Sequence, residues 1–331
     1  MKQKKSRKKL WLTITFSFLA VLVFGGSAYA YMVYHSVHKA INTMHHPVKR
    51  DNAVKREKEV TIKKRDPFSI LLLGVDQREH DKGRSDTMIV LTVNPNKKSI
   101  DMLSIPRDTR TEIVGKGTVD KINHAYAFGD VEMSMNTVEH FLNIPIDYYI
   151  KVNMEGFKDL VDAVDGVTVN NDLAFSAGGQ NFPVGQLHLN GEQALKYSRM
   201  RHDDPRGDFG RQKRQREIID SILDKGASIS SLWNYNDIMD ALAKNVKTNL
   251  SFQDMVDIQS NYKDLRHNIN EMQISGDGQI INDVWYYIVP ESERLAISKK
   301  LRDHLQLDGQ HGASIGESNN DTGASSVPPK S

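Results

Sequence analysis

The chain of 331 residues contains no cysteine. Disulfide bonds, thiolate nucleophiles and cysteine-based metal sites are therefore excluded. The sequence also lacks a Walker A phosphate loop and an HExxH pair. Two common enzyme classes, the P-loop nucleotidases and the HExxH zinc proteases, therefore find no support in its motifs.

A broad excess of positive charge is also missing. The formal net charge is +2, and six Lys or Arg residues fall within residues 1–9, so removing those six charges leaves −4 for the remainder. A protein that binds DNA or RNA needs a wide basic surface. We therefore expect no nucleic acid partner, and we look instead for a discrete anion site.

Charge is absent altogether from Leu10–Tyr34, a stretch of 25 residues. As a helix it would span roughly 37 Å, more than the hydrocarbon core of about 30 Å. The six charges before it outnumber the three in the following sixteen residues, an asymmetry that keeps the short basic end in the cytoplasm. The pattern predicts a transmembrane helix over residues 10–34, in a single-pass type II protein of the cell membrane with a cytoplasmic tail over residues 1–9. A cleavable signal peptide is the alternative, because Ser27-Ala28-Tyr29-Ala30 resembles a cleavage site.

Composition divides the rest of the chain into three parts. Residues 35–66 are rich in Lys, Arg, Glu and His and predict an extracytoplasmic stalk. Residues 67–307 predict one folded domain, which would lie outside the cytoplasm. Residues 308–331 are rich in Gly, Ser, Asn and Pro and predict a disordered tail.

Within residues 67–307, short apolar runs alternate with helical patterns. The runs predict strands over residues 68–75, 87–93, 100–105 and 147–152. Helical periodicity predicts helices over residues 131–142, 154–164, 190–199, 209–225, 235–246 and 252–265, and Asn190 with Gln193 predicts a capping box. This alternation indicates an α/β fold, a layered α-β-α domain with a central, mostly buried mixed sheet. In such sheets ligands bind beyond the strand ends, so residues that border strands are the first candidates for a site.

Seven Lys or Arg residues lie between positions 199 and 216, around the expected start of a helix near Asp208. They are Arg199, Arg201, Arg206, Arg211, Lys213, Arg214 and Arg216. Because a helix N-terminus is already electropositive, a bound anion is the expected partner, and phosphate suits guanidinium groups best. Arg211 and Gln215 share a helix face with two core-directed isoleucines, which directs both toward a cleft. The alternative is a solvated face on which some of these arginines pair with interleaved acidic residues.

Charged residues also border the predicted strands. The three segments are Gly74-Val75-Asp76 after the first strand, Gly83-Arg84-Ser85-Asp86-Thr87 before the second, and Ser104-Ile105-Pro106-Arg107-Asp108 at the end of the third. An acid after a strand is often only a cap for the next turn. With the arginine block, however, these segments supply two carboxylates and several guanidinium groups. That is the set of groups that holds a divalent cation together with a phosphate or pyrophosphate.

The order of these motifs resembles the LytR-CpsA-Psr family of cell-wall phosphotransferases. The motifs are GVD, GRSDT, SIPRDT and KINHAY, followed by YSRMRHDDPRGDFGRQKRQ, and the resemblance covers the N-terminal anchor and the region between residues 67 and 227. It implies a transferase that takes an anionic wall polymer, in the first instance wall teichoic acid, from a polyprenyl pyrophosphate carrier in a Gram-positive type of envelope. The polymer would pass as a phosphodiester to the 6-hydroxyl of N-acetylmuramic acid in peptidoglycan, with release of polyprenyl phosphate.

The same resemblance implies roles for individual residues. Asp76 and Asp86 would bind Mg²⁺, with Mn²⁺ as the alternative metal, and Asp76, Asp86 and Arg107 would be the catalytic residues. The pyrophosphate would be held by Arg84, Arg107, Arg199, Arg201, Arg211 and Gln215. One of the two carboxylates would also help to deprotonate the acceptor hydroxyl.

Two other functions would use the same residues. A pyrophosphatase would present water in place of the sugar hydroxyl, and only product analysis separates it from a transferase. A non-catalytic wall-glycan-binding or regulatory protein would dock an anionic polymer on the basic patch, with no turnover and no dependence on Mg²⁺. We expect the transferase, because acids at the strand ends and inward arginines together suit phosphoryl transfer.

Overall fold

The computed structural model describes residues 24, 26–27, 29, 31–50, 56, 58–76, 83–226 and 242–307. Most of the predicted span Leu10–Tyr34, the basic tail before it and the predicted disordered tail 308–331 lie outside the described residues. Among the residues that are described, no helix combines the length and the apolar character needed to cross a membrane.

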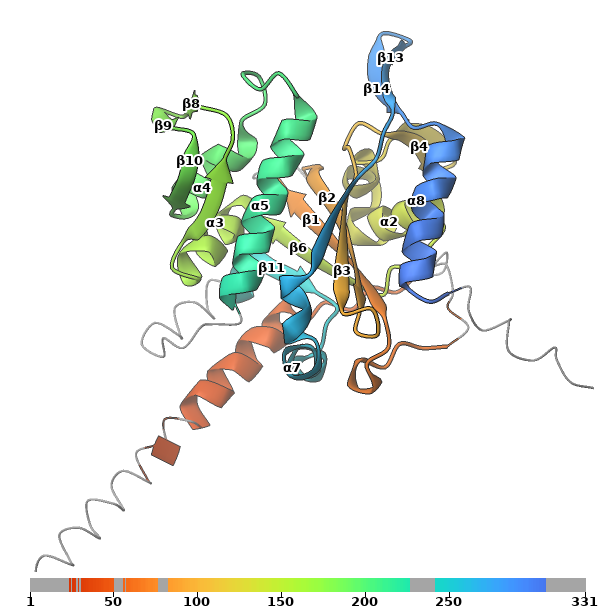
Figure 1. The fold of residues 1–331 in the computed structure, drawn as a ribbon. Coiled ribbons are helices and arrows are strands. Elements are labelled where there is room, and N and C mark those ends of the chain that lie inside the picture. Colours follow the sequence, from red (N-terminus) through yellow and green to blue (C-terminus); the bar gives the residue numbers. More distant parts are fainter. Residues whose placement is uncertain are drawn as a thin grey trace, which may run out of the picture.

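A six-stranded mixed sheet forms the centre of the domain (Figure 1). In spatial order its strands are β11 (Val246–Thr248), β6 (Tyr148–Asn153), β1 (Phe68–Val75), β2 (Ser85–Asn94), β3 (Ser99–Ser104) and β12 (Ile269–Gln273). Strand β1 runs antiparallel to β2 and parallel to β6, and β12 runs parallel to β3. The predicted α/β class and mixed sheet are confirmed, and the four predicted strands are β1, β2, β3 and β6.

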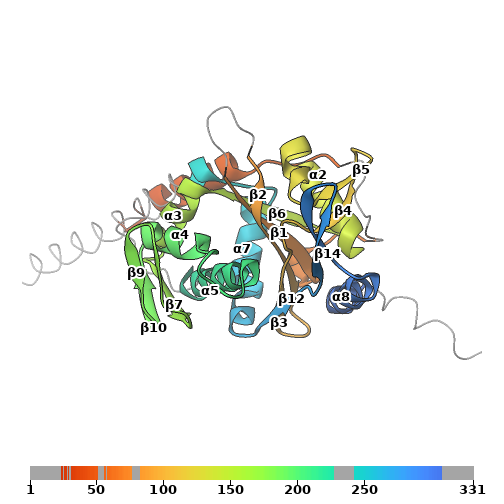
Figure 2. The same cartoon turned by 90° about the horizontal axis from the view of Figure 1, so that it is seen from above.

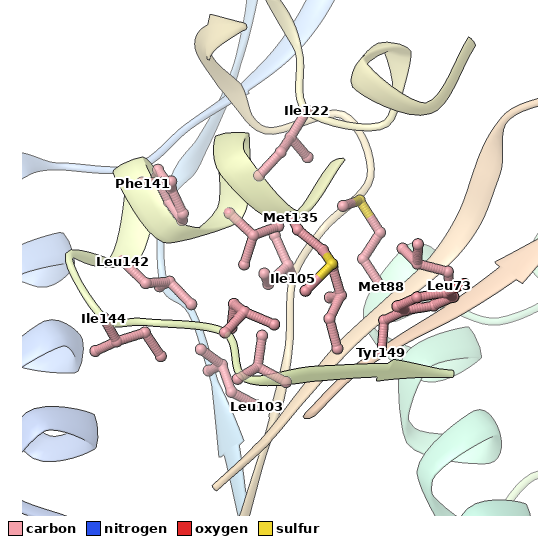
Figure 3. Packing of buried hydrophobic residues seen from close by; sticks show 14 of the residues in the cluster. Leu73, Met88, Leu103, Ile105, Ile122, Met135, Phe141, Leu142, Ile144 and Tyr149 are labelled. Atoms are coloured by element: carbon pink, nitrogen blue, oxygen red, sulfur yellow. The ribbon is translucent and has the colours of Figure 1, made fainter. Parts of the chain in front are cut away.

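Helices cover both faces of this sheet (Figure 2). One face packs against α2 (His124–Leu142) and α8 (Glu291–His304), in a core that includes Leu73 and Met135 (Figure 3). The other face packs against α7 (Phe252–Asn261) and the inner side of α5 (Asp208–Gly226). Alternate side chains of β1 enter the two cores, which is why its sequence is a continuous apolar run.

A second group of elements lies beyond α5. It comprises α3 (Met154–Ala163), α4 (Gly191–Arg199), β7 (Val167–Asn171), β8 (Phe175–Ala177), β9 (Gln180–Phe182) and β10 (Gly185–Leu189). These elements share a separate apolar core, to which α5 contributes Ile218. The predicted capping box of Asn190 and Gln193 is confirmed at the start of α4. Helix α5 therefore stands between this group and the central sheet (Figure 2).

Several predicted boundaries were wrong. The helix predicted over 131–142 begins earlier, at His124, and is kinked at Gly129 and Asp130. The helix predicted over 252–265 divides into α7 and the 3₁₀ helix η2 (Lys263–His267). Most of the helix predicted over 235–246 lies outside the described residues, and its last residue belongs to strand β11. The small antiparallel pairs were missed altogether, as was helix α8; they are β4 (Arg110–Ile113) with β5 (Thr118–Lys121), β7 with β10, β8 with β9, and β13 (Asp277–Ile281) with β14 (Val284–Ile288).

The described residues of the predicted stalk contact the domain. Residues 31–44 are helical, and Ile41 and Met44 are buried against Val246. Further on, Arg50 lies 2.7 Å from the buried carboxylate of Glu139. The segment that follows the predicted membrane span is therefore fixed to the sheet over these residues.

Candidate functional site

Strands β1 and β2 bring Asp76 and Asp86 to the same edge of the sheet. The register pairs Gly74 with Thr87 and Val75 with Ser85, so Asp86 is the extra residue of a β-bulge. A Cβ atom at Gly74 would lie only 2.9 Å from Cβ of Thr87, so this close approach of the strands requires glycine. Because of the bulge, the side chain of Asp86 departs from the regular alternation of side chains along β2. Asp86 lies beside the end of β1, which Asp76 directly follows.

Two arginines from distant parts of the chain meet at Asp86. Nη1 of Arg107, which follows β3, lies 2.6 Å from Oδ1 of Asp86. Nη2 of Arg211, in the first turn of α5, donates to the backbone oxygen of Asp86 at 3.3 Å and lies 2.7 Å from Oδ1 of Asp208. The sheet edge and the start of α5 are therefore joined by charged side chains, as the sequence predicted for Arg211.

The guanidinium groups of Arg107 and Arg201 lie near that of Arg211, so like charges are close together at this site. Burial disfavours the charged form of Arg107, but its ion pairs with Asp86 and Asp108 and the nearby charge of Asp208 outweigh that effect and raise its pKa. The pKa of Arg211 is lowered, first by burial and then by repulsion from Arg107 and Arg201, against the attraction of Asp208 and Asp86. An anion bound at this edge would relieve the repulsion that Arg107 and Arg201 exert on Arg211.

The remaining predicted residues lie around this centre. Nη2 of Arg199 is 3.9 Å from Oδ2 of Asp76. The backbone nitrogen of Asp76 donates to the backbone oxygen of Arg84 at 3.4 Å, and the side chain of Arg84 is exposed. Gln215 is half-buried one turn beyond Arg211. The structure thus brings Asp86, Arg107, Arg201 and Arg211 together and pairs Asp76 with Arg199. It does not bring in the side chains of Arg84 and Gln215, which border the group.

The other four cations of the basic block belong to structural ion pairs. These pairs are Arg206 with Asp172 at 2.7 Å, Lys213 with Asp172 at 2.6 Å, Arg214 with Asp204 at 2.6 Å and Arg216 with Glu271 at 2.7 Å. Arg206 also bonds Asp204, and both members of the Arg214–Asp204 pair are buried. Ion pairing, the alternative for this block, therefore accounts for these four cations, and the anion site stays a prediction for Arg199, Arg201 and Arg211.

Three residues of the site were not predicted. Oδ2 of Asp108 lies 3.6 Å from Nε of Arg107, and Oδ1 of the same carboxylate lies 2.8 Å from Nζ of Lys121. Asp208 was predicted only as a helix start, yet it supplies an anion to the first turn of α5 and pairs with Arg211. The position of Asp108 directly after Arg107 was the available signal; nothing in the sequence placed Lys121 near it.

The carboxylates can be tested against the predicted metal. Among the described residues, no three His, Asp or Glu side chains are placed to hold a metal ion. Mg²⁺, however, often takes one or two carboxylates and completes its shell with substrate phosphate and water. Asp76 and Asp86 therefore fit a cation that binds together with a phosphate group, and they do not fit a closed structural metal site.

Two cavities of the described region lie elsewhere. One of about 270 Å³ is lined by residues that include Gln180 and His188, and one of about 400 Å³ by residues that include Asp130 and Lys151. Neither is lined by a predicted site residue. We assign the site from its charges and contacts, because an anion site at a sheet edge depends on those more than on enclosure.

Known proteins resemble this chain over nearly its whole length. Residues 31–303 match the LytR_cpsA_psr family. The polyisoprenyl-teichoic acid–peptidoglycan teichoic acid transferase TagU of Bacillus cereus is 54% identical over 301 residues, which cover 91% of this chain and 99% of that protein. The crystal structure of B. subtilis TagU is 50% identical with a TM-score of 0.60 and covers 72% of this chain and 97% of that one. A structure of TagT bound to LIIa-WTA is 32% identical with a TM-score of 0.67 and covers 78% of this chain and 100% of that one. The chain belongs to the LytR_cpsA_psr family.

Proposed function

We propose that this protein is a phosphotransferase of the cell wall. It takes a teichoic acid polymer from a polyprenyl pyrophosphate carrier and attaches it to the 6-hydroxyl of N-acetylmuramic acid in peptidoglycan. The names of its TagU relatives, at 50–54% identity, support this substrate class. The observation that carries the chemistry is the meeting of Arg107 and Arg211 at Asp86.

The reaction is a displacement at phosphorus. The acceptor oxygen forms a bond to the phosphorus atom that bears the polymer, and the bond from that phosphorus to the bridging oxygen breaks. Polyprenyl phosphate leaves with that oxygen, and the hydroxyl proton passes to a carboxylate, Asp76 or Asp86. Such a step needs little covalent help from the protein, since positioning and charge neutralisation lower most of the barrier.

The arginines provide that neutralisation. Arg107 and Arg201 already repel Arg211, so these arginines gain from an anion in both the bound substrate and the transition state. Arg199, Arg84 and Gln215 border this group and would complete the pyrophosphate contacts. Because Arg107 also bonds Asp86, it fixes the orientation of that carboxylate toward the substrate.

A divalent cation is part of the proposal. Asp76 and Asp86 would hold Mg²⁺, or Mn²⁺ in its place, together with oxygens of the pyrophosphate. When bound, the ion would act as a Lewis acid that withdraws charge from the phosphoryl oxygens.

We also propose that the enzyme is anchored in the cell membrane as a single-pass type II protein. The uncharged stretch Leu10–Tyr34 and the six basic residues before it support this topology. The domain with the charged site would then lie outside the cytoplasm, where the peptidoglycan acceptor is found.

The test uses the full chain in detergent micelles with a lipid-linked disaccharide pyrophosphate, a peptidoglycan oligosaccharide and Mg²⁺. Mass spectrometry should detect the phosphodiester-linked product and polyprenyl phosphate. Arg107→Gln and Asp86→Asn should abolish transfer while thermal unfolding stays near that of wild type, and Arg302→Gln on the remote helix α8 serves as the matched control. Full transfer by both site variants would refute the assignment.

Product analysis also separates the alternatives. Water-derived products alone, in the presence of the acceptor, would identify a pyrophosphatase. Polymer binding without turnover and without dependence on Mg²⁺ would identify a non-catalytic glycan-binding or regulatory protein.

A further inference from the structure

The β13–β14 hairpin presents apolar side chains beside the charged site. Its two-residue turn, Asn282 and Asp283, has positive φ at both positions (47° and 60°), the form that suits the twist of two antiparallel strands. The hairpin extends from the body of the domain (Figure 1). Near its tip, the paired residues Ile280 and Trp285 are 69% and 46% exposed. Exposed apolar side chains grouped in this way indicate a binding surface.

The indole of Trp285 lies close to Gly278 on the neighbouring strand. A Cβ atom at Gly278 would lie 2.8 to 3.0 Å from Nε1, Cζ2 and Cε2 of the indole. One edge of the ring therefore packs against Gly278 of β13, since the glycine has no side chain to displace it. The ring is positioned at that edge, and Trp285 is 46% exposed, so it offers an aromatic platform to a ligand.

Aromatic residues connect this platform to the charged site. Tyr287 lies two positions after Trp285 on β14, so both side chains point to the same face of the hairpin. The ring of Tyr287 meets that of Phe209 edge-on, with centroids 5.7 Å apart. Phe209 directly follows Asp208, and the backbone nitrogen of Tyr287 donates to the backbone oxygen of Asp108 at 2.9 Å. Tyr287 is buried, so its contacts fix the base of the hairpin beside the site, and the exposed Trp285 lies further toward the tip.

We propose that this face of the hairpin binds the acceptor glycan and directs its hydroxyl to the charged site. The inference rests on the transferase function proposed for this protein. A sugar ring offers a face of C–H groups that packs on an aromatic ring, and its hydroxyl groups stay solvated at the edge. The arginines bind the charged donor, so an acceptor that is mostly uncharged needs a different kind of surface close by.

Position in the molecule favours the wall over the bilayer as the partner. The helix over residues 31–44 includes the last four residues of the predicted membrane span, and it leaves the domain at the end opposite to the hairpin (Figure 1). The tip of the hairpin therefore points away from the membrane side. An apolar tip that served to insert into lipid would lie near the anchor.

Kinetics on the full chain in detergent test the proposal. With a peptidoglycan tetrasaccharide as acceptor, Trp285→Ala should raise the KM for the acceptor about tenfold and leave the KM for the lipid-linked donor within about twofold. Trp285→Tyr should recover most of the loss, because it restores an aromatic ring. Leu295→Ala, at an exposed apolar position on α8, is the matched control and should change neither constant. An unchanged acceptor KM in Trp285→Ala would overturn the proposal.

Fluorescence gives a second readout that does not need turnover. The chain has three tryptophans, Trp11, Trp233 and Trp285, so replacing the first two with Phe leaves the hairpin as the only indole emitter. The tetrasaccharide should shift or quench that emission. If the wild type forms no transfer product yet the emission responds, the transferase function fails and the glycan surface stands. If anionic lipid vesicles change the emission and the tetrasaccharide does not, the partner is the membrane and the proposal fails.

Discussion

The division of the basic block into binding and structural cations predicts opposite behaviour for two neighbouring arginines. Arg214 is 2% exposed, and its carboxylate partner Asp204 is fully buried. Arg214→Met keeps most of the volume but leaves a buried carboxylate with only Arg206 beside it. Breaking a buried ion pair costs about 3–5 kcal/mol of unfolding free energy. Because Arg206 still pairs with Asp204, we expect a loss of about 3 kcal/mol. For a domain of this size that cost lowers Tm by roughly 6–12 °C.

Arg211→Gln should do the reverse. Burial lowers the pKa of its guanidinium most, and repulsion from Arg107 and Arg201 lowers it further, so losing the charge relieves both effects. Its partner Asp208 is partly exposed and can be solvated after the change. We expect Tm to stay within about 2 °C, and transfer to fall about 10²–10³-fold, the usual cost of removing one group that neutralises transition-state charge.

The assay combines thermal unfolding, followed by circular dichroism, with transfer measured well below both melting temperatures. Lys213→Met is the matched control, because its ion pair with Asp172 is exposed and worth about 0–1 kcal/mol. The reasoning would be refuted if Arg211→Gln lost as much stability as Arg214→Met. It would also be refuted if Arg214→Met, while folded, lost as much transfer as Arg211→Gln.

Three further predictions follow from local geometry. Gly74→Ala places Cβ 2.9 Å from Cβ of Thr87, so it should displace the bulge and reduce transfer. The double variant Gly74→Ala, Thr87→Gly should recover transfer activity, and a double variant without recovery would count against the bulge as the cause. Chelation of divalent cations should stop transfer, and Asp76→Asn should raise the Mg²⁺ concentration needed for the half-maximal rate; a rate that does not depend on Mg²⁺ would disprove the metal assignment. The imidazole of His304 is buried and hydrogen-bonded to Thr92 and Ser99. Burial lowers its pKa, although the nearby carboxylate of Asp101 acts in the opposite direction. The unfolded chain therefore binds a proton more readily than the folded chain. The free energy of unfolding should keep its full value above about pH 6.5 and fall as the pH drops below that value. The denaturant concentration at the unfolding midpoint should decrease with it, and the decrease should be smaller in His304→Gln.

Elements with strong local patterns could be predicted from the sequence. Strand β1 matches its prediction at both ends, because side chains of both faces are apolar and the run is unbroken. Strand β12 was missed because it is a half-exposed edge strand whose sequence, INEMQ, mixes polar and apolar residues. The β13–β14 hairpin had an available signal, since Asn282-Asp283 between two apolar pairs suits a two-residue turn.

The sequence predicted the placement of site residues that border neighbouring strands. It did not predict contacts between residues that are far apart along the chain. Asp76, Asp86 and Arg107 border strands that pair directly, so sheet topology alone brings them close. The choice between structural and binding arginines depends on partners far along the chain, such as Asp172 for Arg206 and Glu271 for Arg216. Charge spacing within a helix cannot show which distant carboxylate will face each side chain.

Helix α5 explains how one basic segment can serve both stability and binding. On one side, the buried ion pair of Arg214 with Asp204 holds it to the loop that precedes it. On the other, Arg216 bonds Glu271 of β12 and the hydroxyl of Ser104 at the end of β3. These contacts restrict rotation and sliding of the helix, so the remaining face keeps Arg211 directed at Asp86. A group held in place before the substrate arrives stabilises the transition state without reorganisation, so the structural ion pairs contribute to catalysis through the rigidity that they give to α5.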